Sequence, residues 1–325
     1  MATVTTDIER AADVLRAGGL VALPTETVYG LGADVEDPIA VARIFQVKGR
    51  PASHPLIVHI AAADELDAWV EEVPAAARLL AEHFWPGPLT LVLRRGHRVP
   101  LEATDGLETV AVRVPDHPVA LALLSAFGGG ITAPSANRFG SVSPTTADHV
   151  RAELGDAVDF VLDGGSCQVG VESTIVDVTG ETPSILRPGG VTREDLEAVL
   201  GHPVVVPSTS DVRVPGQHPS HYAPRARVVL VEPEKVVAEA ELAQQAGHQV
   251  GVLLPPPLAD AAVKAHVVVP LPGSLDAYAH GLYGFLRELD QQGCDLIVAS
   301  LPVEEGLGLA IANRLRRAAG PRSSQ

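Results

Sequence analysis

The chain of 325 residues contains only two cysteines, Cys167 and Cys294, which lie far apart in the sequence. Such scarcity indicates reduced thiols in a cytoplasmic setting, and no Cys/His spacing fits a zinc site. The sequence has no run of about 18 apolar residues, so we expect no membrane span. Met1 to Arg10 does not join a basic start to an apolar core, so we expect no signal peptide.

Several catalytic signatures are also missing. The sequence has no Gly-x-x-x-x-Gly-Lys-Ser/Thr phosphate loop and no Gly-x-Gly-x-x-Gly dinucleotide fingerprint. It also lacks the Gly-x-Ser-x-Gly elbow that carries the nucleophile of many hydrolases. A nucleotide site, if the chain has one, must therefore be built from other elements.

Positive charge is scarce as well, because the formal net charge is −16. Residues 1–200 hold 14 basic and 28 acidic side chains, and residues 201–325 hold 10 and 12. Neither half of the chain carries a net positive charge, so direct binding to nucleic acid is disfavoured. Only three of the 24 basic residues are lysines, and Lys48 is one of them.

What the sequence does contain is a dense stretch between residues 20 and 60. The apolar run Leu20–Leu23 predicts a short buried strand that ends at Pro24, and the polar residues Thr25-Glu26-Thr27 follow directly. Lys48 and Arg50 then occupy a Gly/Pro turn before a second buried strand, Leu56–Ile60. Polar groups at strand ends, with cations on an adjoining loop, are how open α/β sheets make anion sites.

Two later stretches add to this pattern. Ser135-Ala136-Asn137 leads into a run of small and hydroxyl residues that reaches Thr145, which is a candidate nucleotide cradle beside an anion site. Gly201–Arg227 contains five prolines and no helical period, and a loop this long is usually disordered or functional. His218, His221 and Tyr222 within it favour a function.

The order of the elements predicts α/β architecture throughout. Beyond residue 227 the apolar pattern alternates between strands and helices, which implies a small parallel doubly wound domain. The expected strands there are 228–231, 250–254, 267–271 and 296–299, and the expected helices are 235–246, 259–265, 275–289 and 307–318. We therefore divide the chain into a first α/β domain that carries these dense stretches (1–200), a linker (201–227) and a C-terminal domain (228–325).

The stretch Pro24-Thr-Glu-Thr-Val-Tyr-Gly-Leu-Gly32, together with Lys48-Gly-Arg-Pro51, resembles the threonylcarbamoyl-AMP synthase family. The likeness extends over roughly residues 8 to 225 in five motifs in the same order. It implies a YrdC-like twisted mixed sheet with helices, and the C-terminal part resembles the extra, Rossmann-like domain of the longer family members. The implied reaction joins L-threonine, bicarbonate and ATP into threonylcarbamoyl-AMP and pyrophosphate, for the threonylcarbamoyladenosine modification of tRNA.

The resemblance also implies roles for individual residues. Lys48 and Arg50 would be catalytic, Lys48 beside the phosphates or the incoming carbonate. L-Threonine would be held by Thr27, His59, Arg113 and Ser173. ATP would contact Arg50, His54, Thr109, Ser135, Asn137, Ser143, Arg187 and Tyr222, with Tyr222 on a lid that closes over the nucleotide. Mg²⁺ would be held through the ATP phosphates, with no protein metal site. A tRNA threonylcarbamoyl-transferase would accept the product.

Taken alone, these residues allow simpler interpretations. Lys48 and Arg50 resemble ordinary solvated loop cations, and His59 resembles a satisfied core histidine. Arg113 interrupts an apolar strand and therefore needs a partner, for which Asp116 is a candidate. An RNA-binding or ribosome-assembly module is the alternative function, and a carbamoyl-phosphate-handling transferase or maturation factor is a third.

Overall fold

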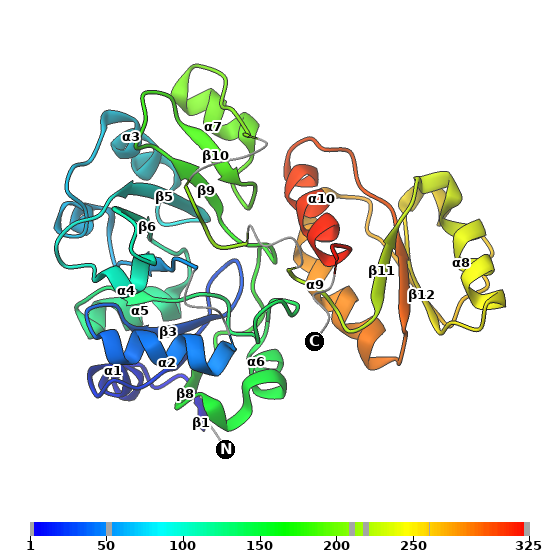
Figure 1. Cartoon of the computed structure of the whole chain (residues 1–325), viewed down its shortest axis with the longest axis horizontal. Helices are drawn as coiled ribbons and strands as arrows, with labels where there is room; N and C mark the ends of the chain where they lie inside the picture. The colour runs from blue at the N-terminus through cyan, green and yellow to red at the C-terminus, as the bar shows by residue number, and fades with distance from the viewer. Residues whose placement is uncertain (1–2, 50–53, 208–211, 217–220, 260, 322–325) are drawn as a thin grey trace. The chain divides into compact units, whose positions relative to one another are not determined.

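The computed structural model describes residues 3–49, 54–207, 212–216, 221–259 and 261–321. The chain forms two compact units (Figure 1). Unit 1 comprises Met1–Phe139 and Ser143–Gln217, and unit 2 comprises Gly140–Val142 and His218–Gln325. The predicted linker, residues 201–227, is therefore divided between the two units. In the described part of the chain, no helix combines the length and apolarity needed to cross a membrane.

Unit 1 is built on a mixed sheet, which confirms the predicted α/β class. Among the described residues, its strands lie in the order β1 (Thr3–Thr5), β8 (Phe160–Leu162), β2 (Val21–Leu23), β3 (Gly30–Asp34), β7 (Ile131–Thr132), β4 (Ile57–His59), β6 (Thr109–Arg113), β5 (Leu89–Arg94), β9 (Thr174–Asp177) and β10 (Ser184–Arg187). Strands β2 and β3 pair antiparallel, whereas β4 pairs parallel with β6 and β5 parallel with β9.

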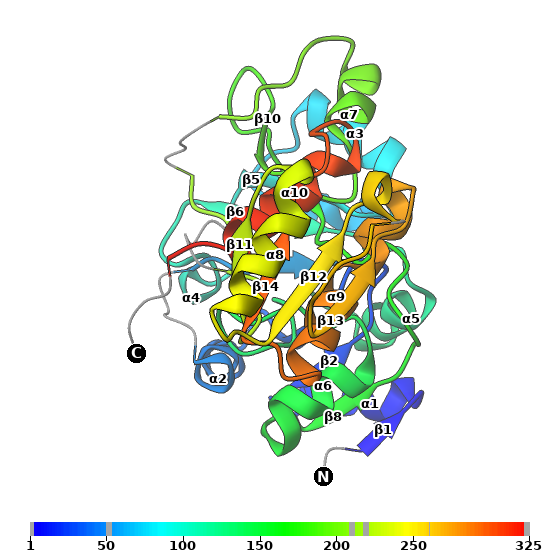
Figure 2. The ribbon, with the colours of Figure 1, turned by 90° about the vertical axis from the view of Figure 1, so that its right-hand side faces the viewer.

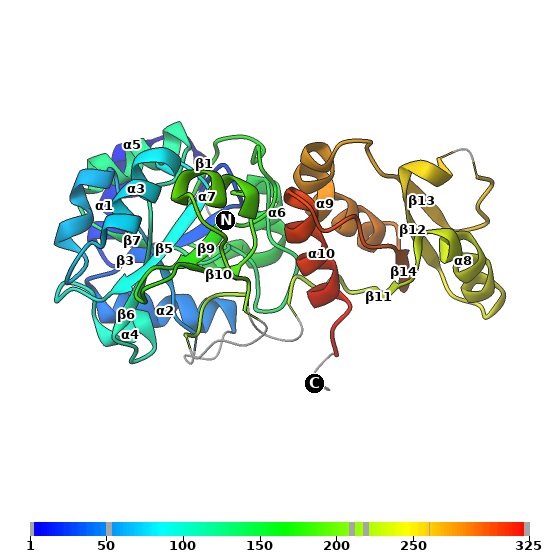
Figure 3. The same cartoon turned by 90° about the horizontal axis from the view of Figure 1, so that it is seen from above.

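Helices pack apolar residues onto this sheet. Helices α1 (Ile8–Arg16) and α5 (Pro118–Phe127) pack together and share a core with β2, β7 and β8. A second, larger core takes residues from α2 (Pro38–Lys48), α3 (Ala75–Phe84), α6 (Ala147–Leu154) and α7 (Arg193–Leu200). The shorter helical turns are η1 (Ala63–Ala68), α4 (Leu101–Thr104) and η2 (Gly155–Ala157). Figure 3 shows α1 and α5 on the side of the sheet away from α2, in agreement with their separate cores.

Strand β3 was not expected from the sequence, because its Gly-Leu-Gly start is poor in strand formers. Close packing explains the second glycine. A Cβ at Gly32 would lie 2.8 Å from Cδ2 of Leu23 and 2.9 Å from Cγ2 of Ile131. The glycine therefore lets the strand on each side of β3 approach it.

Unit 2 is a parallel doubly wound domain, as predicted. Its four strands lie in the order β11 (Arg227–Leu230), β14 (Leu296–Ala299), β12 (Val250–Leu254) and β13 (Val267–Pro270), and every pairing is parallel. Helix α8 (Val236–Gln245) covers one face, and α9 (Leu275–Gln291) and α10 (Leu307–Ala318) cover the other (Figure 2). The short turns are η3 (Pro233–Lys235) and η4 (Pro256–Leu258).

One predicted helix is wrong. The segment 259–265 was expected to be helical, but residues 261–265 have no helical assignment and only η4 precedes them. Pro255, Pro256 and Pro257 explain the outcome. They set a single tight turn, and the remaining segment is too short to offset the cost of nucleating an α-helix.

Replacing Gly32 by alanine should destabilise the protein, because the new methyl group would displace two well-packed side chains. We expect the free energy of unfolding to fall by about 1–3 kcal/mol in urea titrations. Gly180→Ala is the matched control, because a Cβ there meets nothing within 4 Å. Equal stability of the two variants would show that β3 does not depend on this close approach.

Candidate functional site

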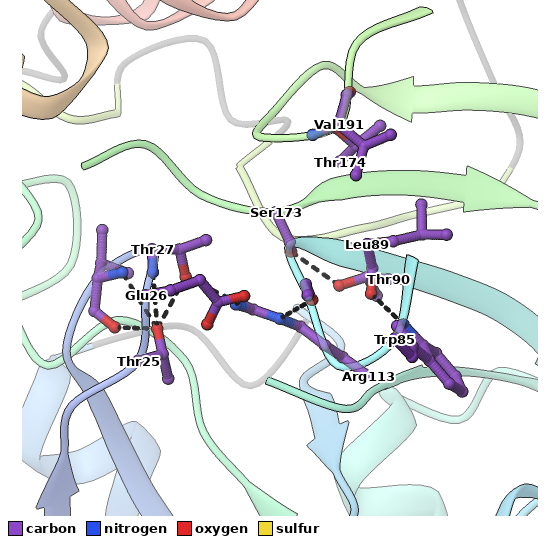
Figure 4. A network of polar contacts seen from close by, with 12 residues as sticks. Thr25, Glu26, Thr27, Trp85, Leu89, Thr90, Arg113, Ser173, Thr174 and Val191 are labelled. Carbon is purple, nitrogen blue, oxygen red and sulfur yellow. Dashed lines mark hydrogen bonds and ion pairs between the residues drawn. The ribbon is translucent and has the colours of Figure 1, made fainter. Parts of the chain in front are cut away.

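The site is centred on Arg113, the last residue of β6 and only 3% exposed. Its guanidinium reaches the loop after β2, where Nη1 donates a hydrogen bond to Oγ1 of Thr27 at 3.0 Å (Figure 4). Its Nε donates to the carbonyl of Gly87 at 3.2 Å. A buried cation is thus held by groups from two separate loops.

The loop that meets Arg113 is shaped by its own threonine. Oγ1 of Thr25 donates to the carbonyl of Val28 at 2.6 Å and accepts from the backbone N–H groups of Thr27 and Val28. Because a hydroxyl has one proton, Thr27 must donate to Thr25 across the 2.8 Å contact between their hydroxyls. The hydroxyl of Thr27 is therefore oriented to accept from Arg113.

The charge partner of Arg113 is Glu26, not Asp116. Oε1 of Glu26 lies 2.6 Å from Nη2 of Arg113, and both side chains are nearly inaccessible to solvent. Asp116 is exposed on the segment after β6. Water already solvates that carboxylate, whereas a buried cation needs a partner inside the same low-dielectric region. The backbone of Glu26 is fixed as well, because its carbonyl accepts from the N–H of Val169 at 2.7 Å.

His59 lies beside Arg113, because β4 and β6 pair in register with His59 opposite Arg113. The imidazole is 3% exposed. Burial, and secondarily the positive charge of Arg113, lower the pKa of His59 to about 3. The ring is therefore neutral at physiological pH and acts as a polar, uncharged group. Three of the four residues predicted to hold threonine are thus brought together.

The fourth, Ser173, belongs to a neighbouring polar cluster. Its hydroxyl lies 2.7 Å from that of Thr90 on β5 and accepts from Nη2 of Arg187 at 3.1 Å. Arg187 also donates to the carbonyl of Ser173 at 2.9 Å. Next to Ser173 in the sequence, Glu172 accepts from the hydroxyl of Ser143 at 2.6 Å. Two residues predicted for ATP, Ser143 and Arg187, are therefore linked to the 172–173 segment.

Lys48 organises the other predicted nucleotide loop. Its ammonium donates to the carbonyl of Asn137 at 2.6 Å and also to the carbonyl of Ser135. The side chain is buried, which corrects the interpretation of Lys48 as a solvated surface cation. The N–H of Phe139 donates in turn to the carbonyl of Lys48 at 2.8 Å. Lys48 and the 135–139 loop are therefore tied together at several points.

The remaining predicted residues are placed separately. The ring of His54 packs edge-on against Phe139, with centroids 5.2 Å apart. Thr109 starts β6 and is half-buried, and Tyr222 is buried within unit 2. Arg50 and His218 lie outside the described residues, so their predicted roles stay predictions.

Neither cysteine thiol is activated, because burial raises the pKa of both. Both are free and buried, and burial raises the pKa of the Cys167 thiol to about 12. Among the residues that the structure describes, no group of three or more His, Cys, Asp or Glu side chains is arranged to hold a metal ion.

Sequence reasoning assigned no role to Glu26, Thr90 or Glu172. Glu26 offered one signal, because a carboxylate just after a buried strand and an arginine inside an apolar strand are complementary charges. Thr90 and Glu172 offered none, since a single threonine in a strand and a single glutamate between strands are common.

Breaking the buried pair on one side should be costly. Glu26→Leu leaves the guanidinium of Arg113 buried without its counter-charge, and we expect a loss of about 3–5 kcal/mol in the free energy of unfolding. The double variant Glu26→Leu/Arg113→Met should lose much less than the sum of the two single variants. Additive losses would mean that the two charges do not depend on each other.

Acid should destabilise the protein through His59. Its pKa is lower in the folded than in the unfolded chain, so the unfolded chain binds the proton first as pH falls below about 6.5. Between pH 7 and 5 we expect this group to remove about 2 kcal/mol of stability. His59→Asn should flatten that pH dependence in urea titrations, whereas His83→Asn, at an exposed position, should not. A variant at position 59 with the original slope would contradict the assignment.

Comparisons with known proteins agree with this geometry. A family model described as "Telomere recombination" matches residues 13–189, and a model described as "Threonylcarbamoyl-AMP synthase, C-terminal domain" matches residues 191–320. The threonylcarbamoyl-AMP synthase of Pyrococcus abyssi is 44% identical over 97% of this chain and 94% of its own length. The Bacillus subtilis protein of the same name is 43% identical over 97% and 93%.

A solved structure of one of these relatives has the same fold as this chain. The crystal structure of P. abyssi Sua5 complexed with L-threonine superposes with a TM-score of 0.91 at 43% identity, covering 96% of this chain and 94% of that one. Both units of this chain are therefore matched in sequence by the two family models and full-length relatives. The chain belongs to the threonylcarbamoyl-AMP synthase family.

Proposed function

We propose that this chain is an L-threonylcarbamoyladenylate synthase that uses L-threonine, bicarbonate and ATP and releases pyrophosphate. It would thus be an ATP-dependent nucleotidyltransferase. The observation that carries the proposal is the buried Arg113, held beside Thr27 and a neutral His59. Family membership and the L-threonine bound to the P. abyssi relative support the same substrate.

Four side chains would recognise threonine at one end of the site. A guanidinium presents five N–H donors in a fixed fork that matches a carboxylate, so Arg113 would bind the α-carboxylate of threonine. Thr27 and Ser173 would add hydroxyl contacts at the edge of this site. His59, being uncharged, would form a hydrogen bond with the substrate without adding a second positive charge.

The nucleotide end is formed by loops. Lys48 holds the carbonyls of Ser135 and Asn137, which fixes a segment rich in small residues against which ATP can lie. Arg50 would neutralise phosphate oxygens from the adjoining turn. The further ATP contacts proposed are His54, Thr109, Ser143, Arg187 and Tyr222.

The reaction needs no protein nucleophile. The threonine nitrogen forms a bond to the carbon of bicarbonate, and a hydroxide leaves as water with a proton from the amine. An oxygen of the resulting carbamate then bonds to the α-phosphorus of ATP, while the bond from that phosphorus to the bridging oxygen of pyrophosphate breaks. The protein contributes by positioning the reactants and by placing positive charge near the phosphates.

Mg²⁺ would arrive with ATP, because this ion keeps several waters and is bound mainly by substrate phosphates. The residues present fit such an ion. Glu172 places a hard oxygen donor beside Ser143, one of the residues proposed for ATP. Mg²⁺ would supply charge neutralisation on the triphosphate.

The product would pass to a second enzyme. A mixed anhydride of a carbamate and a phosphate is a reactive acyl donor that water destroys. A tRNA threonylcarbamoyl-transferase is therefore the proposed acceptor, which would use the product to modify adenosine in tRNA.

The direct test is pyrophosphate release from ATP and bicarbonate with each amino acid in turn. We expect release only with threonine, and threonine-independent release would contradict the proposal.

Arg113→Lys should raise the KM for threonine far more than the KM for ATP, because a fork is replaced by a point charge.

Arg78→Lys is the matched control, since Arg78 forms an exposed ion pair with Asp67 at 2.9 Å elsewhere in unit 1. It should leave both KM values unchanged. If Arg113→Lys changed both KM values equally, its role would be structural instead.

A further inference from the structure

A short segment of the nucleotide loop belongs to unit 2. Residues Gly140–Val142 lie in the sequence between Phe139 and Ser143, both of which belong to unit 1. Asn137 and Ser143, on either side of this segment, are two of the residues proposed for ATP. The middle of that loop therefore belongs to unit 2, to which the proposed reaction has so far assigned only the ATP contact of Tyr222.

Contacts with the linker and with helix α9 hold the segment. The N–H of Ala223 donates to the carbonyl of Gly140 at 2.8 Å, and Ser141 forms an isolated parallel bridge with Ala223. Nη2 of Arg287, on helix α9, donates to the carbonyl of Val142. The backbone is thus fixed at both ends of the segment, once by the linker and once by a guanidinium.

The linker residues just before Ala223 are themselves held by α9 and α10. The ring of Tyr222 lies 5.8 Å from that of Tyr283 on α9, and the guanidinium of Arg314 on α10 lies 5.1 Å from the Tyr222 ring centre. The N–H of His221 donates to the carbonyl of Arg317 at 3.2 Å. Helix α9 therefore holds the segment directly, through Arg287 and Val142, and both helices hold the linker residues beside Ala223.

Tyr222 also has an unusual backbone, with φ of 59° in the left-handed region. A large side chain rarely adopts this conformation, and it persists only where the surroundings determine it. Tyr222 is 1% exposed, so its packing in unit 2 supplies that constraint. Such strain is typical of functional segments, which agrees with the proposed role of the linker.

We infer that Arg287 is a positioning residue of the nucleotide site, acting through Val142 on Ser143. The inference rests on the proposed function, because it takes Ser143 as an ATP contact. A hydrogen bond from a charged donor is stronger than a neutral one, and Val142 is joined to Ser143 by a single peptide bond. Helix α9 thereby sets the backbone from which the hydroxyl of Ser143 projects.

The test compares Arg287→Met, which keeps the aliphatic stem, with Arg287→Lys, which keeps a charged donor. In Arg287→Met the KM for ATP should rise roughly 10-fold or more, the loss expected for one hydrogen bond from a charged donor. The KM for threonine should not change. Arg287→Lys should recover part of the loss. Arg316→Met is the control, because Arg316 lies on α10 and pairs with the partly exposed Glu304.

A second measurement does not depend on activity. Backbone hydrogen exchange of residues 138–145 in the ligand-free protein should be faster in Arg287→Met than in the wild type or in Arg316→Met. If the ATP KM and this exchange rate are both unchanged, or if the KM values of both substrates rise together, the inference is wrong. If the wild type releases no threonine-dependent pyrophosphate, the proposed function fails, while the exchange experiment still decides whether Arg287 holds the loop.

Discussion

The burial of Arg113 is the constraint on which the site in unit 1 depends. Arg113 is 3% exposed, so its guanidinium loses nearly all its hydration. Ion pairs and hydrogen bonds within the fold must offset this desolvation cost. The partners come from separate parts of the chain: the carboxylate of Glu26, the hydroxyl of Thr27 and the carbonyl of Gly87. The loops that carry them are therefore fixed in place by the same charge that we propose binds the substrate.

The neighbours of Arg113 follow from its charge. Glu26 neutralises it, so the buried site has no large net charge before substrate binds. His59 stays neutral because burial and Arg113 both oppose its protonation. A zwitterionic amino acid, which brings one charge of each sign, suits such a site better than a dianion. In this way the electrostatics of one pair limits which class of molecule can enter.

Most of the fold could be predicted from apolar periodicity and from Gly/Pro punctuation. Helix α10 spans the predicted residues 307–318, and the parallel order of unit 2 followed from its alternating pattern. Strand β3 could not be predicted, because its glycines serve a close approach that only the folded sheet reveals. The partner of Arg113 was misjudged for a related reason. Asp116 is near in sequence, whereas Glu26 becomes near only after β6 and the loop after β2 are brought together.

The order of strands in unit 1 also determines when the unit can be completed. Strand β1 pairs with β8, so Thr3–Thr5 must wait for a partner that begins at Phe160. At about 5–20 residues per second, the ribosome exposes the first strand for several seconds before that partner exists. Pairings this distant in sequence close slowly, and an unpaired strand is a site for aggregation until they do. Synthesis of this chain therefore favours an order in which the β2–β3 pair forms early and β1 joins the sheet only after β8 has been made.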